Sequence, residues 1–287
     1  MYATILWSLP VTDTPLYISD LDGTLLQGDA TLSPRSRAAL TTMLHQGLAF
    51  TVATARTAYS VDPILAGLPL QYPLILQNGA VLYDPVAKRY CHAAIIPPAA
   101  ARAMFDLLEA YHLNGFAYCM EDNELRCCYT ELTTPDMRAF YQERNCRYAK
   151  PFCQVAHLAQ LAARDVVFFS MHGEEQRVRP VVSLLQQIAG IAVSFYKDVY
   201  EEDCWYLELA ADTATKYHGV QKLREMYGFS SVTAFGDNYN DLPLFAAADT
   251  KIAVANATEE LKKAADCIIG SNTEDAVVAY LYKQQHK

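Results

Sequence analysis

Two aspartates separated by one residue carry the first chemical signal in the sequence. Asp20 and Asp22 follow the apolar run 16–19, which we interpret as a short buried strand. In an α/β fold this position lies at the carboxyl end of a parallel strand, where ligands bind. We expect Asp20 to attack an electrophile as a carboxylate nucleophile and Asp22 to handle a proton. Asp-Gly pairs also form ordinary turns, and Gly23 permits one. The motif alone therefore favours a catalytic role only weakly over a turn.

A second acidic group follows another predicted strand, residues 232–235. Asp237 and Asp241 are four residues apart, with Asn240 between them, and face similarly if a helix begins here. Carboxylates at neighbouring strand ends repel one another unless a cation joins them, and Mg²⁺ suits such an oxygen-only site. The alternative is a helix start capped by Asp and Asn. Combined with the first motif, the pattern favours a magnesium site.

Four further residues are candidates for binding phosphate. Thr54 follows an apolar strand, where a hydroxyl and the N–H groups of a starting helix can hold an anion, although it could be an ordinary N-cap. Lys216 opens a predicted helix without complementing the helix dipole, which suggests another task, such as neutralising phosphate or Asp20. A lysine on a surface helix is the simpler alternative. Asn78 and Gly79 follow a third strand and predict either a turn or a ligand contact.

The elements that must position these residues alternate between strand and helix. Apolar strands without polar alternation are typical of a parallel sheet covered on both faces. We therefore predict an α/β fold with a doubly wound, Rossmann-like parallel sheet. The predicted strands are 16–19, 48–53, 74–76, 232–235, 252–254 and 267–269. The predicted helices are 34–47, one from about Arg56, 216–226 with Gly228 as its stop, 242–247, 259–265 and 274–282.

An insertion interrupts this order after Asp84 and Pro85. We predict that residues 84–203 form a small α+β domain, and that 1–83 and 204–287 form the core. A helix-strand-strand unit recurs weakly at the two ends of the insertion. The predicted helices of the insertion are 98–112, 136–144, 156–163 and 175–188. Its predicted strands are 116–120, 125–130, 165–171 and 191–196, and a further strand, 205–209, follows it.

Composition excludes several classes of protein. The chain has 287 residues, 52% of them hydrophobic and 19% charged, so it can bury a core and does not resemble a disordered chain. The net charge of −9 argues against a nucleic-acid partner. No apolar run approaches the roughly 18 residues of a membrane span. Residues 1–10 resemble a loose leader without the positive start of a signal peptide. We expect a soluble cytoplasmic protein with no membrane partner; no oligomeric state is predicted.

The cysteines and histidines show no metal or disulfide pattern. The eight cysteines include no C-x-x-C pair, and disulfide scaffolds are short, secreted and rich in loops. We expect reduced and mostly buried thiols. The seven histidines include no pair three or four residues apart, so each is expected to pack or to face solvent.

In this order the motifs resemble the haloacid dehalogenase (HAD) superfamily, and most of all its Cof-type phosphatases. These carry a type IIB cap inserted between motifs two and three. The resemblance spans nearly the whole chain from Leu16. The matching motifs are D-x-D-G-T-L at 20–25, Thr54, Lys216, G-D-x-x-N-D at 236–241, and a tail run at Asn256, Ala257, Lys262, Ala265, Asp266 and 272–274.

The resemblance implies a Mg²⁺-dependent phosphatase that acts on a small phosphorylated metabolite. Asp20 would form an aspartyl-phosphate, while Asp22 would protonate the leaving group and then activate water. Asp20, Asp237 and the backbone carbonyl of Asp22 would hold Mg²⁺, and Asp241 would tune its shell. The phosphoryl oxygens would be held by Thr54, Lys216 and Asn240. Asn78 and Gly79 would lie beside these residues.

The sequence departs from the family pattern at three places. Ala55 replaces a glycine after Thr54, Tyr217 replaces a glycine after Lys216, and Val254-Ala255 replaces Met-Gly. We expect Ala55 and Tyr217 to line the phosphate side and to affect rate or loop geometry. None of the changes removes a reacting group.

Two other functions remain open. A phosphotransferase such as a sugar-phosphate mutase shares the Asp-x-Asp start and a similar cap. A sensor that binds phosphoryl ligands without turnover is disfavoured by the intact Asp20 and Asp22. Substrate identity would depend on the cap, which would close over the substrate and exclude water. The cap residues that could face the site are His112, Tyr118, Arg126 and Tyr129.

Overall fold

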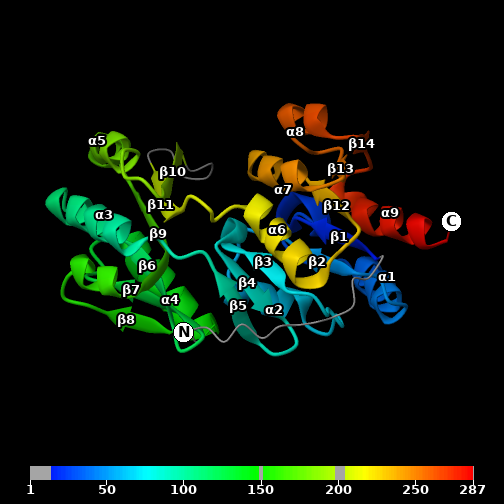
Figure 1. Cartoon of the computed structure of the whole chain (residues 1–287), viewed down its shortest axis with the longest axis horizontal. Helices are drawn as coiled ribbons and strands as arrows, with labels where there is room; N and C mark the ends of the chain where they lie inside the picture. Colours follow the sequence, from blue (N-terminus) through cyan, green and yellow to red (C-terminus); the bar gives the residue numbers. More distant parts are fainter. Residues whose placement is uncertain (1–13, 149–150, 198–203, 287) are drawn as a thin grey trace. The chain divides into compact units, whose positions relative to one another are not determined.

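The computed structural model describes residues 14–148, 151–197 and 204–286, so the predicted leader at 1–10 lies outside the described residues. The described chain divides into two compact units. Residues 14–91 and 215–286 form the core unit, and His92–Ala214 form the inserted unit. Figure 1 shows the helices and strands of both units.

The core unit is built on a parallel sheet. Its strands run in the order β14-β13-β12-β1-β2, and every neighbouring pair is parallel. The strands β2 and β3 are buried along their whole length, as a sheet covered on both faces requires. Their bounds are β1 (Pro15–Ser19), β2 (Phe50–Val52), β12 (Ser231–Gly236), β13 (Thr250–Ala253) and β14 (Cys267–Ile268).

A small antiparallel sheet continues the core beyond β2. It contains β3 (Leu74–Leu76), β4 (Val81–Asp84) and β5 (Arg89–Ala93) in that order. A parallel bridge joins Ala53 to Ile75, so β3 lies beside β2. Neither β4 nor β5 was predicted, because each is short and they enclose a turn at the predicted domain boundary. Since β4 pairs with β3 and β5 pairs with β4, the compact units divide at Cys91 and His92 rather than at residue 84.

Six helices belong to the core unit. Ser33 is the N-cap of α1, and its hydroxyl accepts a hydrogen bond from the Ser36 N–H at 3.0 Å. The predicted Gly228 ends α6 in the left-handed conformation. The helices α1 and α9 pack together, as do α6 and α7. Their bounds are α1 (Pro34–His45), α2 (Ala58–Leu65), α6 (Lys216–Tyr227), α7 (Leu242–Ala247), α8 (Glu259–Ala264) and α9 (Ala276–Gln285).

The inserted unit contains a six-stranded sheet in the order β10-β11-β9-β6-β7-β8. Its neighbours are antiparallel except for the parallel pair β7 and β8. The short β8 was not predicted, since three residues are too few to show alternation. The strand β11 lies beyond the predicted end of the insertion but pairs with β9 and β10. The bounds are β6 (Phe116–Glu121), β7 (Glu124–Tyr129), β8 (Phe152–Gln154), β9 (Asp165–Gly173), β10 (Ile191–Lys197) and β11 (Trp205–Ala211).

Helices cover both faces of this sheet. On α3 (Pro98–Ala110), Phe105 packs edge-on against Phe169, with ring centroids 6.4 Å apart. On α4 (Pro135–Tyr148), Phe140 packs against Phe116 at 4.7 Å. Phe116 pairs with Ser170, the neighbour of Phe169, and successive strand residues face opposite sides. Therefore α3 and α4 lie on opposite faces. The remaining helix, α5 (Glu175–Leu185), packs against α3.

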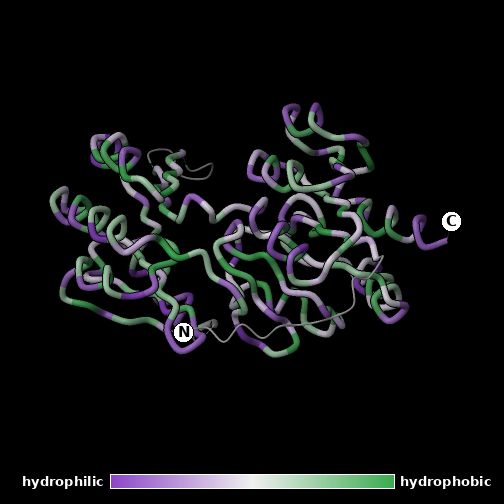
Figure 2. The backbone as a smooth tube through the Cα atoms, in the orientation of Figure 1, coloured by the Kyte–Doolittle hydropathy of each residue, from purple (hydrophilic) through white to green (hydrophobic). Residues whose placement is uncertain are grey.

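The fold class predicted from the sequence is confirmed as a parallel-sheet α/β core with an additional antiparallel-sheet domain. Figure 2 shows apolar stretches along the strands and polar stretches on outer helix turns and at the C-terminal end. Among the helices of the described residues, none is long and apolar enough to cross a membrane.

Candidate functional site

Three carboxylates meet at the carboxyl ends of the central strands. Asp20 follows β1, and Asp237 and Asp241 follow β12. Since β1 and β12 are paired neighbours, with Ser19 opposite Phe235, their ends bring these side chains together. One oxygen of each carboxylate lies within 4.8 Å of the others. We refer to Asp20, Asp237 and Asp241 as the acidic cluster.

A buried lysine joins two members of the acidic cluster. Lys216 is the first residue of α6 and is 1% exposed. Its Nζ lies 2.6 Å from Asp20 Oδ1 and 2.6 Å from Asp241 Oδ1. The simpler alternative for Lys216, a lysine on the surface of a helix, is excluded because the side chain is buried. Lys216 is thus the shared partner of two buried carboxylates, and removing the lysine would leave both without their cation.

Gly79 allows α6 to come this close. Its φ of +101° is a conformation that side chains rarely adopt, and a Cβ there would lie 2.0 Å from the Thr215 carbonyl oxygen. Thr215 is the N-cap of α6, and its hydroxyl accepts a hydrogen bond from the His218 N–H. The described contact of Gly79 is therefore with the backbone that carries Lys216.

The acidic cluster carries more negative charge than Lys216 can balance. Burial, reinforced by the neighbouring carboxylates, raises the pKa of Asp20 to about 8, although Lys216 opposes the change. Burial also raises the pKa of Asp237 to about 6. Burial lowers the pKa of Lys216, but Asp20 and Asp241 outweigh it and raise that pKa, so the amine stays charged. An oxygen-only cluster with excess negative charge fits a divalent cation such as Mg²⁺.

The three carboxylates differ in how far protein donors occupy them. Asp241 is fully buried; its Oδ1 accepts from Lys216, and its Oδ2 accepts from the N–H groups of Asp237 and Asn238 at 3.0 and 3.2 Å. Asp237 accepts through Oδ1 from the Thr24 hydroxyl at 2.9 Å. Within the described ranges, no donor reaches the second oxygen of Asp20 or of Asp237. These two oxygens are therefore available to a cation or to a substrate.

Asp22 lies apart from the acidic cluster. Its carboxylate is half exposed and accepts two hydrogen bonds from Arg56, with Nε to Oδ2 at 2.7 Å and Nη2 to Oδ1 at 2.6 Å. Its side chain is not in the group of carboxylates that could hold a metal. From the sequence, Arg56 is expected only at the start of a helix, and its pairing with Asp22 is not predicted. An arginine two residues after the candidate phosphate residue Thr54 was the available signal.

The remaining predicted residues gather around the ends of β2 and β3. Thr54 is buried, and its hydroxyl accepts a hydrogen bond from the Arg56 N–H at 3.2 Å. Because α2 begins at Ala58 with Thr57 as its N-cap, Thr54 is not the N-cap of that helix. Asn240 donates through Nδ2 to Asn78 Oδ1 at 3.3 Å, so these two predicted residues are in contact.

The tail motif holds the turn that follows Asp20. Asn256 donates to the Gly23 carbonyl at 2.7 Å and accepts from the Asn272 N–H at 3.1 Å. Asn272 donates in turn to the Leu26 carbonyl at 2.8 Å. Gly23 has a φ of +76°, and a Cβ there would lie 2.4 Å from Asp237 Oδ2. The sequence alone supplied no role for Asn256 or Asn272, which position the turn between the two acidic motifs.

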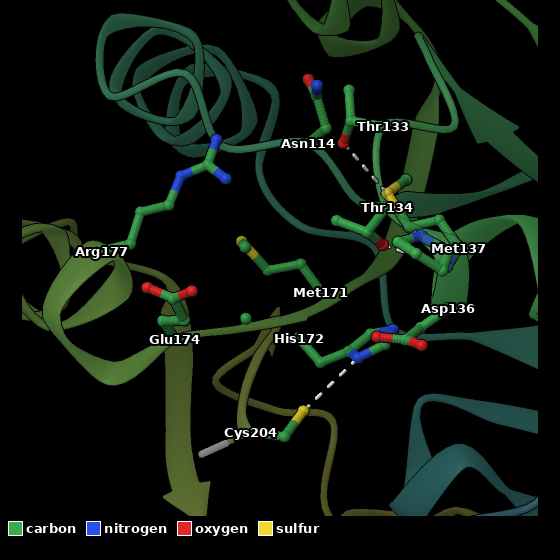
Figure 3. A pocket seen from close by; sticks show the side chains of 12 residues that line it. Asn114, Thr133, Thr134, Asp136, Met137, Met171, His172, Glu174, Arg177 and Cys204 are labelled. Atoms are coloured by element: carbon green, nitrogen blue, oxygen red, sulfur yellow. Dashed lines mark hydrogen bonds between the residues drawn. The ribbon is translucent and has the colours of Figure 1, made fainter.

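The inserted unit contains a cavity of about 490 Å³ (Figure 3). His172 lines the cavity, and its Nδ1 lies 3.5 Å from Cys204 Sγ. The ring of His172 stacks on Tyr206, which stacks on Tyr196, with centroids 5.6 and 5.5 Å apart, so a row of rings crosses β9, β11 and β10. The lining residues are Asn114, Thr133, Thr134, Pro135, Asp136, Met137, Met171, His172, Gly173, Glu174, Arg177 and Cys204.

None of the four predicted cap residues lines this cavity. Tyr118 is buried against Phe168. Arg126 lies 3.3 Å from the Glu121 carboxylate. Tyr129 packs in an aromatic cluster that includes Phe116 and Phe152. His112 accepts a hydrogen bond from the cavity residue Arg177 only through its carbonyl oxygen. The lining residues come from four separate parts of the chain, at 114, 133–137, 171–177 and 204, which only the folded unit brings together.

The sequence profile of haloacid dehalogenase-like hydrolases matches residues 17–281, which include every part of the core site described above. The chain belongs to this family. The predicted membership of the HAD superfamily, with a Cof-type arrangement, is confirmed.

Named relatives of this HAD-family chain are phosphatases. It is 29% identical over 272 residues to pyridoxal phosphate phosphatase YbhA of Escherichia coli, covering 92% of this chain and 96% of the relative. It is 23% identical over 271 residues to 5-amino-6-(5-phospho-D-ribitylamino)uracil phosphatase YitU of Bacillus subtilis, covering 91% and 94%. The HAD-family chain is therefore a phosphatase, a hydrolase of phosphate monoesters.

Solved structures agree with the HAD fold. A haloacid dehalogenase-like hydrolase from Bacteroides thetaiotaomicron superposes with a TM-score of 0.74 at 23% identity, covering 94% of this chain and 99% of that one. At this level of identity the likeness concerns the fold.

The departures from the HAD pattern leave the contacts of the site in place. Ala55 is exposed between Thr54 and Arg56. Tyr217 is 37% exposed and packs edge-on against His218, whereas the neighbouring Lys216 is buried. Val254 is buried in the core. None of the replaced residues contributes a side chain to the acidic cluster.

Proposed function

We propose that this protein is a Mg²⁺-dependent phosphatase that hydrolyses a small phosphorylated metabolite through an aspartyl-phosphate on Asp20. The observation that carries the proposal is the position of Asp20. It is buried at the end of β1, its Oδ1 is held by Lys216 at 2.6 Å, and its Oδ2 has no donor among the described residues. One oxygen is thus anchored while the other is available for reaction.

The acidic cluster would hold the metal ion. Asp237 offers an oxygen without a protein donor, and Asp20 Oδ1 keeps a second lone pair beside its contact with Lys216. The backbone carbonyl of Asp22 is the third proposed ligand. Asp241 supports the site from outside, because both of its oxygens already accept hydrogen bonds. Bound Mg²⁺ would supply positive charge to the phosphoryl oxygens and offset the repulsion among these carboxylates.

The chain's own residues divide the phosphoryl transfer between them. Asp20 attacks phosphorus in line with the leaving oxygen. Asp22 gives that oxygen its proton and afterwards accepts a proton from the water that hydrolyses the aspartyl-phosphate. Arg56 fixes the direction of the Asp22 carboxylate through two parallel hydrogen bonds. Thr54, Lys216 and Asn240 hold the phosphoryl oxygens.

Asn78 and Gly79 support these phosphate ligands. Asn78 accepts a hydrogen bond from Asn240 and so fixes the amide of that residue. Gly79 admits the start of α6 and so places Lys216. We propose that both act on the phosphate through the residues they position.

The cavity of the inserted unit is proposed to recognise the organic part of the substrate. The row of stacked rings that ends at His172 offers a flat surface to a planar group, and Asp136, Glu174 and Arg177 offer polar partners. Two of the relatives are named for phosphorylated ring compounds. A phosphorylated ring compound is therefore the proposed substrate class.

A cytoplasmic location is proposed on the state of the cysteines. All eight are free, as expected of a reducing compartment. Four are buried, one is partly buried and three are exposed, so the expectation of mostly buried thiols is met only in part.

The test is phosphate release from a panel of pyridoxal phosphate, nucleotides, sugar phosphates and p-nitrophenyl phosphate, with and without Mg²⁺. The proposal expects metal-dependent release, with ring compounds preferred. Transfer of the phosphoryl group to a second sugar would indicate a mutase instead. Binding of phosphate compounds without turnover by the folded protein would indicate a sensor.

A variant tests the cavity separately. We expect His172→Ala to lower kcat/KM for the preferred ring substrate about tenfold, because the stacking surface is lost, and to leave glycerol phosphate hydrolysis unchanged. The control is His157→Ala, which changes an exposed histidine of the same unit. An equal loss for both substrates would place His172 outside substrate recognition.

A further inference from the structure

Three cysteines of the inserted unit form a row across neighbouring strands. Cys119 lies on β6, Cys128 on β7 and Cys153 on β8, the strand at the edge of the sheet. Figure 1 shows these three strands side by side. We call Cys119, Cys128 and Cys153 the thiol cluster. Its residues belong neither to the acidic cluster nor to the cavity lining.

The register places two members of the thiol cluster directly opposite each other. Cys128 is the strand partner of Cys153 in the parallel pair β7 and β8. Neighbouring strands lie about 4.7–4.9 Å apart, within the range of about 4.4–6.8 Å that a disulfide requires between Cα atoms. Register partners on neighbouring strands share a face of the sheet, and both sulfurs lie within 4 Å of the same Arg164 nitrogen, so the two thiols are neighbours on that face.

The guanidinium group of Arg164 contacts the sulfurs of both Cys128 and Cys153. Arg164 Nη1 lies 3.8 Å from Cys128 Sγ and 3.9 Å from Cys153 Sγ. The same nitrogen lies 2.8 Å from Glu121 Oε1, and this ion pair keeps the arginine beside the cysteines. A fixed positive charge close to a thiol stabilises its thiolate, which is the reactive form.

Cys119 supports Cys128 from the other side. A hydrogen bond from the Cys119 thiol, together with Arg164, lowers the pKa of Cys128 despite its burial. The pKa of Cys119 is raised, first by that same hydrogen bond and then by burial. Cys119 therefore keeps its proton and acts as a donor, while Cys128 is the better thiolate.

Burial distinguishes the two facing cysteines. Cys128 is fully buried, whereas Cys153 is partly exposed at the sheet edge. A small oxidant from solvent can therefore reach Cys153 first. Cys128 is then in place to attack the oxidised sulfur from within the sheet.

We propose that Cys128 and Cys153 are a thiol modification site that hydrogen peroxide converts to a disulfide. The Cys153 sulfur attacks peroxide; the O–O bond breaks, sulfur is oxidised to a sulfenic acid, and the other oxygen takes up the thiol proton and leaves as water. The Cys128 thiolate then attacks that sulfur, the S–S bond forms, and the S–O bond breaks; the departing hydroxide takes up the proton that Cys128 released and becomes a second water. Two thiols and one peroxide thus give one disulfide and two waters. The bond joins β8 covalently to β7, and a dithiol reductant reverses it.

Peptide mapping of the full-length protein tests this site. The protein is treated with a small excess of hydrogen peroxide, its free thiols are alkylated after denaturation, and its peptides are analysed by mass spectrometry. We expect a linked pair of peptides containing Cys128 and Cys153, two hydrogen atoms lighter than the separate peptides, which dithiothreitol separates. Recovery of both cysteines as free thiols while the exposed Cys91 and Cys267 are oxidised would overturn the proposal.

Variants separate the roles of the cysteines. In Cys128→Ser, we expect no crosslink and a Cys153 sulfenic acid that dimedone traps. The matched control is Cys127→Ser, which changes the adjacent buried cysteine, and we expect it to form the crosslink normally. A disulfide between Cys119 and Cys128 would contradict the pairing inferred from the register. The readout is a mass, so it does not depend on phosphatase activity.

A further variant tests the contribution of the guanidinium. We expect Arg164→Gln to slow disulfide formation about tenfold, since the positive charge that stabilises the thiolates is lost. Arg102→Gln is the control, because Arg102 is an exposed arginine of α3 that pairs with Asp106. Equal rates for the two variants would exclude a role for Arg164 in the oxidation.

Discussion

Arg56 donates two parallel hydrogen bonds, of 2.7 and 2.6 Å, to the Asp22 carboxylate, although the Asp22 side chain is half exposed. Bidentate arginine–carboxylate pairs fix direction as well as distance. Asp22 therefore has a defined orientation at the turn that follows Asp20. Exposed ion pairs contribute little to stability. We therefore propose that this pair serves catalysis by orienting Asp22.

Replacing Arg56 should reduce turnover without unfolding the protein. We expect Arg56→Gln to lower kcat by about tenfold to a hundredfold, because Asp22 loses its fixed direction as a proton donor. The free energy of unfolding should change by less than about 1 kcal/mol. Steady-state kinetics and urea unfolding measure the two effects. Arg35→Gln, at an exposed position of α1, is the control, and an unchanged kcat in Arg56→Gln would contradict the positioning role.

Replacing Asp20 should abolish turnover and leave the fold intact. We expect Asp20→Asn to lose at least about a thousandfold in kcat, because an amide cannot form the aspartyl-phosphate. Burial already disfavours a charge at this position, so a neutral side chain should not destabilise the metal-free protein. Phosphate release, circular dichroism and thermal unfolding check both statements. Asp62→Asn removes a carboxylate outside the acidic cluster and should remain active; normal hydrolysis by Asp20→Asn would falsify the assignment.

Mg²⁺ binding should strengthen as the pH rises. The pKa values of about 8 for Asp20 and about 6 for Asp237 lie above the ordinary 3.8 of the unfolded chain. The stability that the protonated carboxyls provide is therefore complete below about pH 4 and is lost as the pH rises through 6 and 8. Protons also compete with the metal over this range.

Thermal unfolding with Mg²⁺ or with EDTA at several pH values measures this linkage. Without metal, Tm should fall as the pH rises from about 5 to about 8.5, and added Mg²⁺ should raise Tm more at the alkaline end. EDTA should stop phosphate release at every pH. The Asp20→Asn variant should show a weaker dependence on both pH and Mg²⁺. Full activity after thorough chelation would mean that the acidic cluster does not serve a metal.

Adding a single methyl group at Gly79 should damage the core. We expect Gly79→Ala to cost at least about 2 kcal/mol of unfolding free energy, because the positive φ and the Thr215 carbonyl both exclude a Cβ. Denaturant unfolding measures the loss. Gly28→Ala is the matched control, since its Cβ would meet nothing within 4 Å, and we expect a change within about 0.5 kcal/mol. Equal stability of the two variants would show that α6 does not need this close approach.

The family, the α/β order and the positions of the acidic motifs could all be predicted from the sequence. These depend on local patterns: apolar runs without alternation, a carboxylate directly after a strand, and glycines in the turns. Parallel strands that end at one edge then place Asp20 near Asp237 for any register that keeps β1 beside β12.

The partners of the polar side chains could not be predicted, because they depend on how distant segments pack. Lys216 follows Asp20 by 196 residues, and no local pattern shows that it is buried between Asp20 and Asp241. Likewise, Arg56 reaches Asp22 across two strand ends, and Cys128 faces Cys153 only through the register of β7 and β8. The hydrophobic pattern of a segment predicts the face on which a residue lies. It does not predict which distant segment packs beside that residue, because this depends on the packing of the whole chain. The short strands β4, β5 and β8 escaped prediction for the same reason, because strand pairing rather than their own sequence defines them.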